Sequence, residues 1–362
     1  MVLFEFVALL LLDTLQNASG MKKNVFGNIE DIVVNFKVVT PIGTVECSGG
    51  NFPRVSAGPD MMNMMFGSEG TLGVVTEAIV RVREVPQSVI YGSVIFYNFD
   101  QGVQAMREVA RQRCQPASIR LVDNEQFRLA QVFKPESANP TRDGYMSAIQ
   151  QAYVLKFKGF DEHKMVAMTL LFQGANRAET RAQERQVYGI CKRFNGMAGD
   201  ATNGIRGYFL TYMIAYIRDV ALDYNFMAES FETTVPWTKV HTLCAAVKER
   251  IAKEIRIHRI PGEPLISCRV TQTYDTGCCV YFYFGFLFKG VAEPAKVFGQ
   301  IEASARDTII EHGGSISHHH GIGKHRTKWL EGHHGPIAIA MMRSMKKTID
   351  PKNTFNSGNL LL

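Results

Sequence analysis

Hydrophobic and polar residues alternate along this chain with two periods, that of a strand and that of a helix. The period of two that is typical of a half-buried strand is clearest in residues 278–288, CCVYFYFGFLF. One face holds Val280, Phe282, Phe284 and Phe286, and the other holds Tyr281 and Tyr283. The preceding run ISCRVTQTY (266–274) predicts an antiparallel neighbour, joined through a turn at residues 275–277. Packing and chemistry can therefore occupy opposite faces of one sheet.

Strand patterns also dominate the first quarter of the chain. Residues 32–39 form a β-branched run that turns at residues 41–43 into a second strand through Val45, which predicts a hairpin. Further on, the Gly-rich turn GSEGTLG (67–73) leads into a strand. Its alternating apolar residues are Ala78, Val80 and Val82. Pro86 ends this block and marks a boundary.

The helical period follows in two amphipathic segments. A helix that begins near Asp100 places Val103, Met106 and Ala110 on one face. Residues 293–314 predict another helix, which ends at a pair of glycines. Its apolar side holds Val297, Ile301 and Ile309.

A third helical segment, GYFLTYMIAYIRDVALDY (207–224), is apolar nearly all round. We expect it to be a buried helix, interrupted by Arg218 and Asp219. Residues 136–151 are polar and contain Pro and Gly, which suggests a surface segment. Strands and helices together with hairpins predict an α+β fold.

Composition narrows the class of protein without identifying it. The 362 residues are 46% apolar and 20% charged, which is ordinary for a globular chain with room for two domains. The net charge of +6 is mild and its Lys and Arg residues are dispersed, so no nucleic-acid partner is expected. Seven Cys without a CxxC pair favour a reducing compartment over a disulfide framework. Residues 1–12 are apolar but shorter than the ~20 residues of a membrane span, and we interpret them as neither anchor nor signal peptide.

The densest group of reactive side chains is SHHHGIGK, residues 317–324. His318, His319 and His320 could supply acid–base groups, because His titrates near neutral pH. A metal site is a second possibility, but three adjacent side chains rarely face one centre, and no helical HxxxH completes a ligand set. A surface loop is the third. We expect no metal.

Single polar residues in apolar surroundings form a second group of candidates. Arg218 needs a partner or a bound anion, because an unpaired buried charge is costly, and a salt bridge with Asp219 is the simple alternative. Arg120 and Arg269, in strand-like contexts, raise the same question. Tyr281 alone would be an ordinary half-buried sheet aromatic. The turn GSEGTLG, without GxGxxG spacing, is weak evidence for a phosphate or flat-ring site.

Several strings taken together identify a family. They are ASGMKKN (18–24), GNIEDIVV (27–34), GSEGTLGV (67–74), PASIRLVDN (116–124), FKGFD (157–161), LTYMIAYIRD (210–219), ESFETTVPW (229–237), CRVTQTYD (268–275), VYFYFGF (280–286), GGSISHHHGIGK (313–324) and DPKNTF (350–355). In this order they resemble the alkyldihydroxyacetonephosphate synthases (alkylglycerone-phosphate synthases), which are FAD flavoproteins of the vanillyl-alcohol-oxidase type. The resemblance covers roughly residues 17–360.

This resemblance implies a fold with two parts: an FAD-binding domain of PCMH type, split in sequence, and a cap domain with an antiparallel sheet and flanking helices. It assigns residues 17–86 to the C-terminal part of the FAD-binding domain, 87–314 to the cap, and 315–362 to the His loop and the return to the FAD domain. Residues 1–16 are unmatched. The chain would then lack the half that binds the FAD pyrophosphate, and we expect it not to retain FAD on its own.

The reaction that the resemblance implies is a transfer in ether-lipid and plasmalogen biosynthesis. Acyl-dihydroxyacetone phosphate and a long-chain fatty alcohol give alkyl-dihydroxyacetone phosphate and a fatty acid, with FAD and no net redox change. A flavin ring nitrogen forms an adduct with the substrate carbon, the carboxylate leaves, and the alcohol replaces it. The family further implies a homodimer on the inner face of the peroxisomal membrane.

The resemblance also assigns roles to residues. Tyr281 matches the catalytic tyrosine that moves the substrate proton, and His318, His319 and His320 match essential histidines near the flavin. Arg218 matches the arginine that binds the substrate phosphate, and Arg120 one on which activity depends. FAD contacts are implied at Asn17, Ala18, Ser19, Gly20, Glu69, Gly70, Thr71, Leu72, Gly73, Val74 and Val75. We expect Tyr281, Arg218 and the His loop to converge on one cavity.

The sequence departs from the family at its N-terminal edge, where Asn17 stands in place of an arginine. Two other functions stay open: an FAD-dependent 2-hydroxy-acid dehydrogenase of the same wide family, and a shortened protein without activity. A long apolar tunnel with a phosphate at Arg218 would favour the transferase, and a short polar pocket the dehydrogenase.

Overall fold

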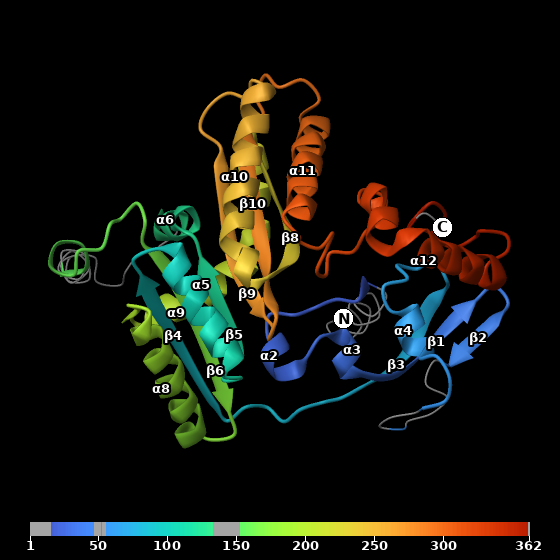
Figure 1. The fold of residues 1–362 in the computed structure, drawn as a ribbon, viewed down its shortest axis with the longest axis horizontal. Helices are drawn as coiled ribbons and strands as arrows, with labels where there is room; N and C mark the ends of the chain where they lie inside the picture. The colour runs from blue at the N-terminus through green and yellow to red at the C-terminus, as the bar shows by residue number, and fades with distance from the viewer. Residues whose placement is uncertain (1–15, 47–51, 53–55, 133–152, 361–362) are drawn as a thin grey trace. The chain divides into compact units, whose positions relative to one another are not determined.

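A computed structural model describes residues 16–46, 52, 56–132 and 153–360 (Figure 1). The chain divides into two compact units: unit 1 comprises residues 1–85 and 315–362, and unit 2 comprises residues 86–314. The segments 1–12 and 136–151, interpreted above from sequence, lie outside the described residues. Within the described ranges, no helix has the length and apolar character needed to span a bilayer.

Unit 1 is built on a three-stranded antiparallel sheet of order β2-β1-β3. Its elements are α2 (Lys23–Phe26), α3 (Ile29–Ile32), β1 (Val33–Thr40), β2 (Gly43–Glu46), α4 (Met61–Met65), β3 (Val74–Val80) and α12 (Thr327–Ile349). The expected hairpin is β1–β2, and the turn GSEGTLG leads into β3 as predicted. The alternation predicted to reach Val82 ends earlier, since this side chain lies beyond β3 and is 89% exposed.

The core of unit 1 joins segments that are far apart in sequence. Phe36 and Val38 of β1 pack with Leu72 and Val75, and Met345 and Ile349 of α12 lie against this cluster. Helix α12 is interrupted at Gly335, whose φ of +79° is not helical. The C-terminal end of helix α12 is therefore part of the same hydrophobic core as the first strands.

Unit 2 contains a seven-stranded antiparallel sheet of order β7-β4-β6-β5-β9-β10-β8. Its elements are β4 (Ser88–Phe96), α5 (Phe99–Arg111), β5 (Ser118–Val122), α6 (Asn124–Val132), η1 (Tyr153–Phe157), β6 (Val166–Gly174), α8 (Arg177–Arg193), β7 (Met197–Ala198), α9 (Ala201–Asp223), β8 (Phe226–Pro236), η2 (Trp237–Lys239), α10 (Val240–Ile257), β9 (Leu265–Thr273), β10 (Gly277–Leu287) and α11 (Pro294–Glu311). The α+β fold predicted from sequence is confirmed.

One face of this sheet is apolar and covered by helices. The side chains predicted for it on β10, namely Val280, Phe282, Phe284 and Phe286, are all 0% exposed. They form one cluster with residues of α5, α8, α10 and α11. Helix α5 begins at Phe99 after the N-cap Asn98, whose side chain accepts from the N–H of Gln101, so Asp100 lies inside the helix and the predicted cap was wrong.

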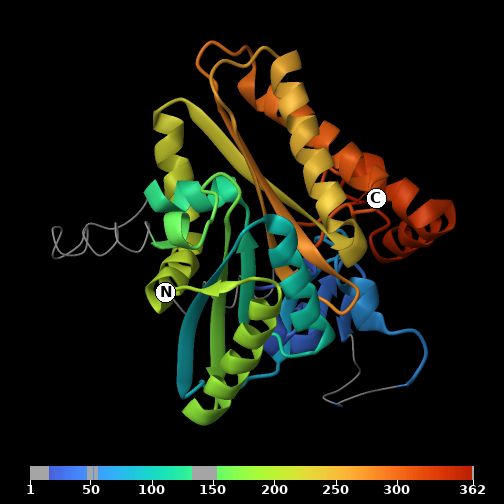
Figure 2. The same ribbon diagram turned by 60° about the vertical axis from the view of Figure 1, so that its left-hand side comes forward.

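Helix α9 lies on the opposite face of the sheet (Figure 2). The prediction of a buried helix over residues 207–224 was wrong, because Tyr216, Val220 and Tyr224 are each more than half exposed. The helix approaches the sheet through small residues: a Cβ on Gly204 would lie 2.4 Å from the carbonyl oxygen of Gly92. A helix that packs on one side only leaves its other apolar side chains exposed.

Candidate functional site

The second face of the unit 2 sheet is polar in its centre. Tyr281 of β10 is paired with Arg269 on β9 and with Glu232 on β8, so the three side chains project from the same face. We call this surface the polar face. Phe282 projects from the opposite face, which confirms the predicted register of this strand.

Tyr281 has a cation as its neighbour on the polar face. The guanidinium carbon of Arg269 lies 4.7 Å from the ring centroid of Tyr281 and 5.1 Å from that of Tyr283. Burial strongly raises the pKa of the Tyr281 hydroxyl and the Cys279 thiol adds to this rise, whereas the positive charge of Arg269 lowers it. The phenol of Tyr281 therefore keeps its proton at neutral pH.

Arg269 is an unusual arginine because it has no ion pair with any described residue of the chain. Its Nε atom is buried and, in the described ranges, has no hydrogen-bond partner. Arg120 lies on the same face, because its neighbour Val122 is paired with Arg269 and residues two apart on a strand share a face. Arg120 is 3% exposed, and its guanidinium carbon lies 5.2 Å from the ring centroid of Tyr208 on α9.

Arg218, the predicted phosphate ligand, is held by carboxylates near the edge of the sheet. Its NH1 atom donates to Oε2 of Glu229 at 2.9 Å, and its Nε lies 3.7 Å from Asp219. The local salt bridge considered from sequence is present, and Glu229 on edge strand β8 is the closer partner. The side chains of Arg218 and Glu229 are 44% and 51% exposed, so this ion pair lies at the surface.

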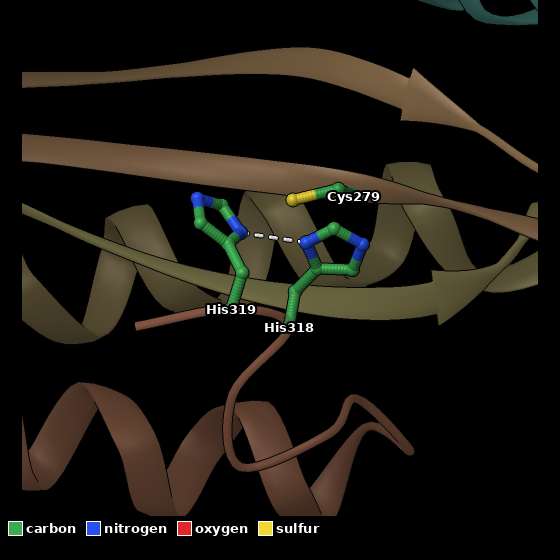
Figure 3. Close-up of side chains that lie close together, drawn as sticks. All are labelled: Cys279, His318 and His319. Carbon is green, nitrogen blue, oxygen red and sulfur yellow. Dashed lines mark hydrogen bonds between the residues drawn. The ribbon is translucent and has the colours of Figure 1, made fainter. Parts of the chain in front are cut away.

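The three histidines occupy a loop without regular secondary structure in unit 1. Nδ1 of His318 lies 2.6 Å from Nδ1 of His319, and Figure 3 marks this contact by a dashed line. The planes of the two rings are nearly perpendicular, at 85°. One Nδ1 must donate and the other accept, so the two rings cannot both be imidazolium. The ring of His320 lies 4.7 Å from that of His319 at 62°. Cys279, also drawn there, belongs to β10 of unit 2.

The turn GSEGTLG fits a role in cofactor binding. Gly67 and Gly70 have φ of +72° and +73°, which favours glycine, and a Cβ on Gly73 would lie 2.4 Å from the carbonyl oxygen of Val39. The hydroxyl of Ser68 is buried and has no hydrogen-bond partner among the described residues. A buried, unsatisfied hydroxyl beside close-lying backbone is what a bound ligand would satisfy.

The carboxylate of Glu69 in this turn bonds to the protein itself. It accepts hydrogen bonds from the backbone N–H groups of Ile322 and Gly323, at 2.6 and 2.8 Å, and from the side-chain amide of Asn359 at 2.8 Å. The sequence could not reveal these contacts because they span more than 250 residues. The sequence singled out Arg269 by its strand-like context and placed Tyr283 on the same face as Tyr281, but it could not show that Arg269 lies against both rings.

Comparison with known proteins places these features in a family. Residues 85–360 match the family described as FAD linked oxidases, C-terminal domain. The chain belongs to this family. It is 45% identical over 344 residues to an alkyldihydroxyacetonephosphate synthase of Caenorhabditis elegans, covering 95% of this chain and 57% of that protein. A synthase of the same name from Trypanosoma brucei brucei is 31% identical, with 95% of this chain and 54% of that protein covered.

A solved structure is also similar to this chain. A chain titled alkyldihydroxyacetonephosphate synthase superposes with a TM-score of 0.72 at 28% identity, covering 95% of this chain and 56% of that chain. The resemblance inferred from the sequence is therefore confirmed. The chain spans just over half the length of these relatives.

The remaining predictions of the site are not tested by these observations. Tyr281 and Arg218 belong to unit 2 and the His loop to unit 1, and their convergence on one cavity stays a prediction. So do the FAD contacts at residues 17–20 and 69–75, and the absence of a metal.

Proposed function

We propose that this chain provides the substrate-binding cap and the His loop of an FAD-dependent alkyl transferase of ether-lipid synthesis. The substrates are acyl-dihydroxyacetone phosphate and a long-chain fatty alcohol, and the products are alkyl-dihydroxyacetone phosphate and a fatty acid. Its similarity to alkyldihydroxyacetonephosphate synthases over 95% of its length supports this reaction. We also propose that the protein acts as a homodimer at the inner face of the peroxisomal membrane.

One observation on the polar face carries this proposal. Tyr281, which by resemblance matches the family's catalytic tyrosine, is half-buried, retains its proton and has Arg269 beside its ring. Such a phenol can give its proton to the departing carboxylate, and the phenolate so formed can then take the proton that the substrate carbon loses. When the alcohol adds, Tyr281 returns a proton to the substrate carbon and takes the hydroxyl proton of the alcohol, so the protons balance and Tyr281 ends in its initial state.

Other residues would bind and orient the reactants. The turn GSEGTLG and residues 17–20 would hold FAD, which would supply the reactive ring nitrogen of the exchange. Arg218 would bind the substrate phosphate in place of Glu229, since a guanidinium offers a planar fork to phosphate oxygens. The shared contact of His318 and His319 offers one neutral imidazole beside a second donor, which suits a developing charge.

The experiment is a conservative substitution in the flavin-loaded, full-length protein. Tyr281→Phe removes only the hydroxyl and should lower the exchange of acyl for alkyl groups by on the order of 10²–10⁴-fold, which is the usual contribution of a positioned acid–base group. Bound flavin and the melting temperature should stay unchanged. Exchange is measured with a labelled fatty alcohol.

Tyr283→Phe is the matched control. It removes a hydroxyl from the same face of the same strand, and its ring also stacks near Arg269. Activity of this variant should stay within a few-fold of the parent. Equal losses in both variants, or a Tyr281→Phe enzyme with most of its activity, would contradict the role proposed for Tyr281.

A further inference from the structure

The backbone at Glu69 is held in an unfavourable conformation. Its φ of +49° lies in the left-handed region, which residues other than Gly, Asn and Asp seldom adopt. Such strain persists only where surrounding contacts hold it in place, and it often marks functional positions. Among the described residues, the side chains and N–H groups that donate hydrogen bonds to Glu69 belong to the C-terminal segment of unit 1.

Four hydrogen bonds join Glu69 to that segment. Oε1 accepts from the N–H of Ile322 at 2.6 Å, and Oε2 accepts from the N–H of Gly323 and from Nδ2 of Asn359, both at 2.8 Å. The carbonyl oxygen of Glu69 accepts from Nδ2 of Asn356 at 2.6 Å. Bonds from N–H groups to a carboxylate are stronger than those between neutral groups.

The loop is shaped to receive this carboxylate. Gly321 has φ of +77°, and a Cβ on it would lie 2.6 Å from Oε1 of Glu69. Gly323 has φ of +54°, and the carbonyl of Gly321 accepts a hydrogen bond from Arg326 at 2.7 Å. Both glycines thus permit a backbone that turns its N–H groups toward Glu69 directly after the three histidines.

We propose that Glu69 is a positioning residue for the His loop. Its carboxylate fixes the backbone of residues 321–323 and so determines where His318, His319 and His320 stand relative to the turn GSEGTLG. Glu69 was expected to contact FAD, which stays a prediction, and its side chain connects the expected cofactor turn to the expected catalytic loop. This inference rests on the proposed function only for the consequence for turnover.

The test uses Glu69→Gln in the full-length, flavin-loaded protein. An amide of the same shape keeps one acceptor, but its NH₂ group would face a backbone N–H and the bond there would be lost. Amide hydrogen exchange at residues 322 and 323 should accelerate by at least about tenfold, since these bonds protect those N–H groups. Turnover, kcat, should fall by on the order of 10–100-fold with KM nearly unchanged, because the histidines are misplaced while substrate still binds.

Two further variants make the outcome specific. Glu77→Gln on β3 is the matched control, because Glu77 is 53% exposed and pairs only with Lys37 in the described part of unit 1. Glu77→Gln should change neither the amide hydrogen exchange at residues 322 and 323 nor kcat. Asn359→Ala removes one donor to Glu69 and leaves the two backbone bonds, so it should give a smaller change in the same direction, and it serves if Glu69→Gln does not fold.

Three results would overturn the proposal. Unchanged exchange at residues 322 and 323 would show that the bonds do not hold the loop. Accelerated exchange with unchanged kcat would show that the loop position does not matter for catalysis, and a loss of kcat equal to the loss of bound flavin would assign Glu69 to the cofactor. If the parent enzyme catalyses no acyl exchange, the proposed function fails, and the imidazole NMR signals of residues 318–320 still report whether Glu69→Gln moves the loop.

Discussion

Among single residues, Arg269 has a guanidinium that lacks the ion pair a half-buried charge normally has. Its neighbours on the polar face are the rings of Tyr281 and Tyr283, and no described carboxylate pairs with it. Keeping such a charge is costly, so a stability role does not explain it. Stabilisation of a Tyr281 phenolate, as in the proposed mechanism, would explain it.

We therefore expect Arg269→Met to lower kcat at least about tenfold while the free energy of unfolding changes by less than about 1 kcal/mol, because no ion pair is broken. Arg269→Lys keeps the charge and should retain more activity. Arg113→Met is the control, since Arg113 is 79% exposed and pairs with Asp275 at the surface. Steady-state kinetics and urea unfolding check both statements, and a large loss of stability in Arg269→Met would speak for a structural role.

At the scale of elements, helix α9 depends on close approach to the sheet. A Cβ on Gly204 would lie 2.4 Å from the oxygen of Gly92, whereas one on Gly299 of α11 meets nothing within 4 Å. Alanine is better than glycine in a helix by about 1 kcal/mol, so Gly299→Ala should stabilise unit 2 by about that amount. Gly204→Ala should destabilise it by about 1–3 kcal/mol, because backbone atoms must move apart.

Urea unfolding followed by the fluorescence of Trp237 measures both effects, since this residue is buried in unit 2. The two glycines are matched, being helical positions in the same unit. If Gly204→Ala stabilises unit 2 as much as Gly299→Ala does, the close contact between α9 and Gly92 of β4 is wrong.

The strands of the unit 2 sheet could be predicted from the sequence. Which side of helix α9 is exposed to solvent could not. In β10 the local alternation settles which residues are buried, because a strand between two neighbours has only two faces. In α9 the composition is apolar on every side, so nothing local indicates that Gly204 and Gly207 face the sheet while Ile205 and Tyr216 are exposed. The hydrogen bonds of Glu69 could not be predicted either, because the residues around the turn do not indicate which distant residues of the C-terminal segment will contact it.

For the molecule as a whole, buried Lys346 joins the C-terminal segment to the turn GSEGTLG of unit 1, and its ion pair with Asp350 lies within that segment. Lys346 is 5% exposed, and its Nζ donates to Oδ2 of Asp350 and to the carbonyl oxygens of Thr71 and Phe355, at 2.6, 2.7 and 2.6 Å respectively. This explains the string DPKNTF, which begins with Asp350. Lys346→Met should destabilise unit 1 by about 3–5 kcal/mol, because it leaves a buried carboxylate without its cation. A circular-dichroism melt would show the loss as a lower transition temperature.

The same ion pair makes unit 1 sensitive to acid. Burial would raise the pKa of the Asp350 carboxyl, but hydrogen bonds from Lys346 and from the N–H groups of Phe355 and Thr354 outweigh it and lower the pKa to about 2. Since this lies below the ordinary value of 3.8, the stabilisation is complete above about pH 4 and is lost as the pH falls toward 2.

The two tryptophans of the chain separate the units in this experiment, because Trp329 belongs to unit 1 and Trp237 to unit 2. With Trp237→Phe, the fluorescence of Trp329 should show the urea midpoint of unit 1 falling between about pH 4 and pH 2. Asp350→Asn should lower that midpoint at neutral pH and flatten its dependence on pH, because the group that titrates in this window is gone. A midpoint equally dependent on pH in the Asp350→Asn variant would assign the acid sensitivity of unit 1 to other carboxylates.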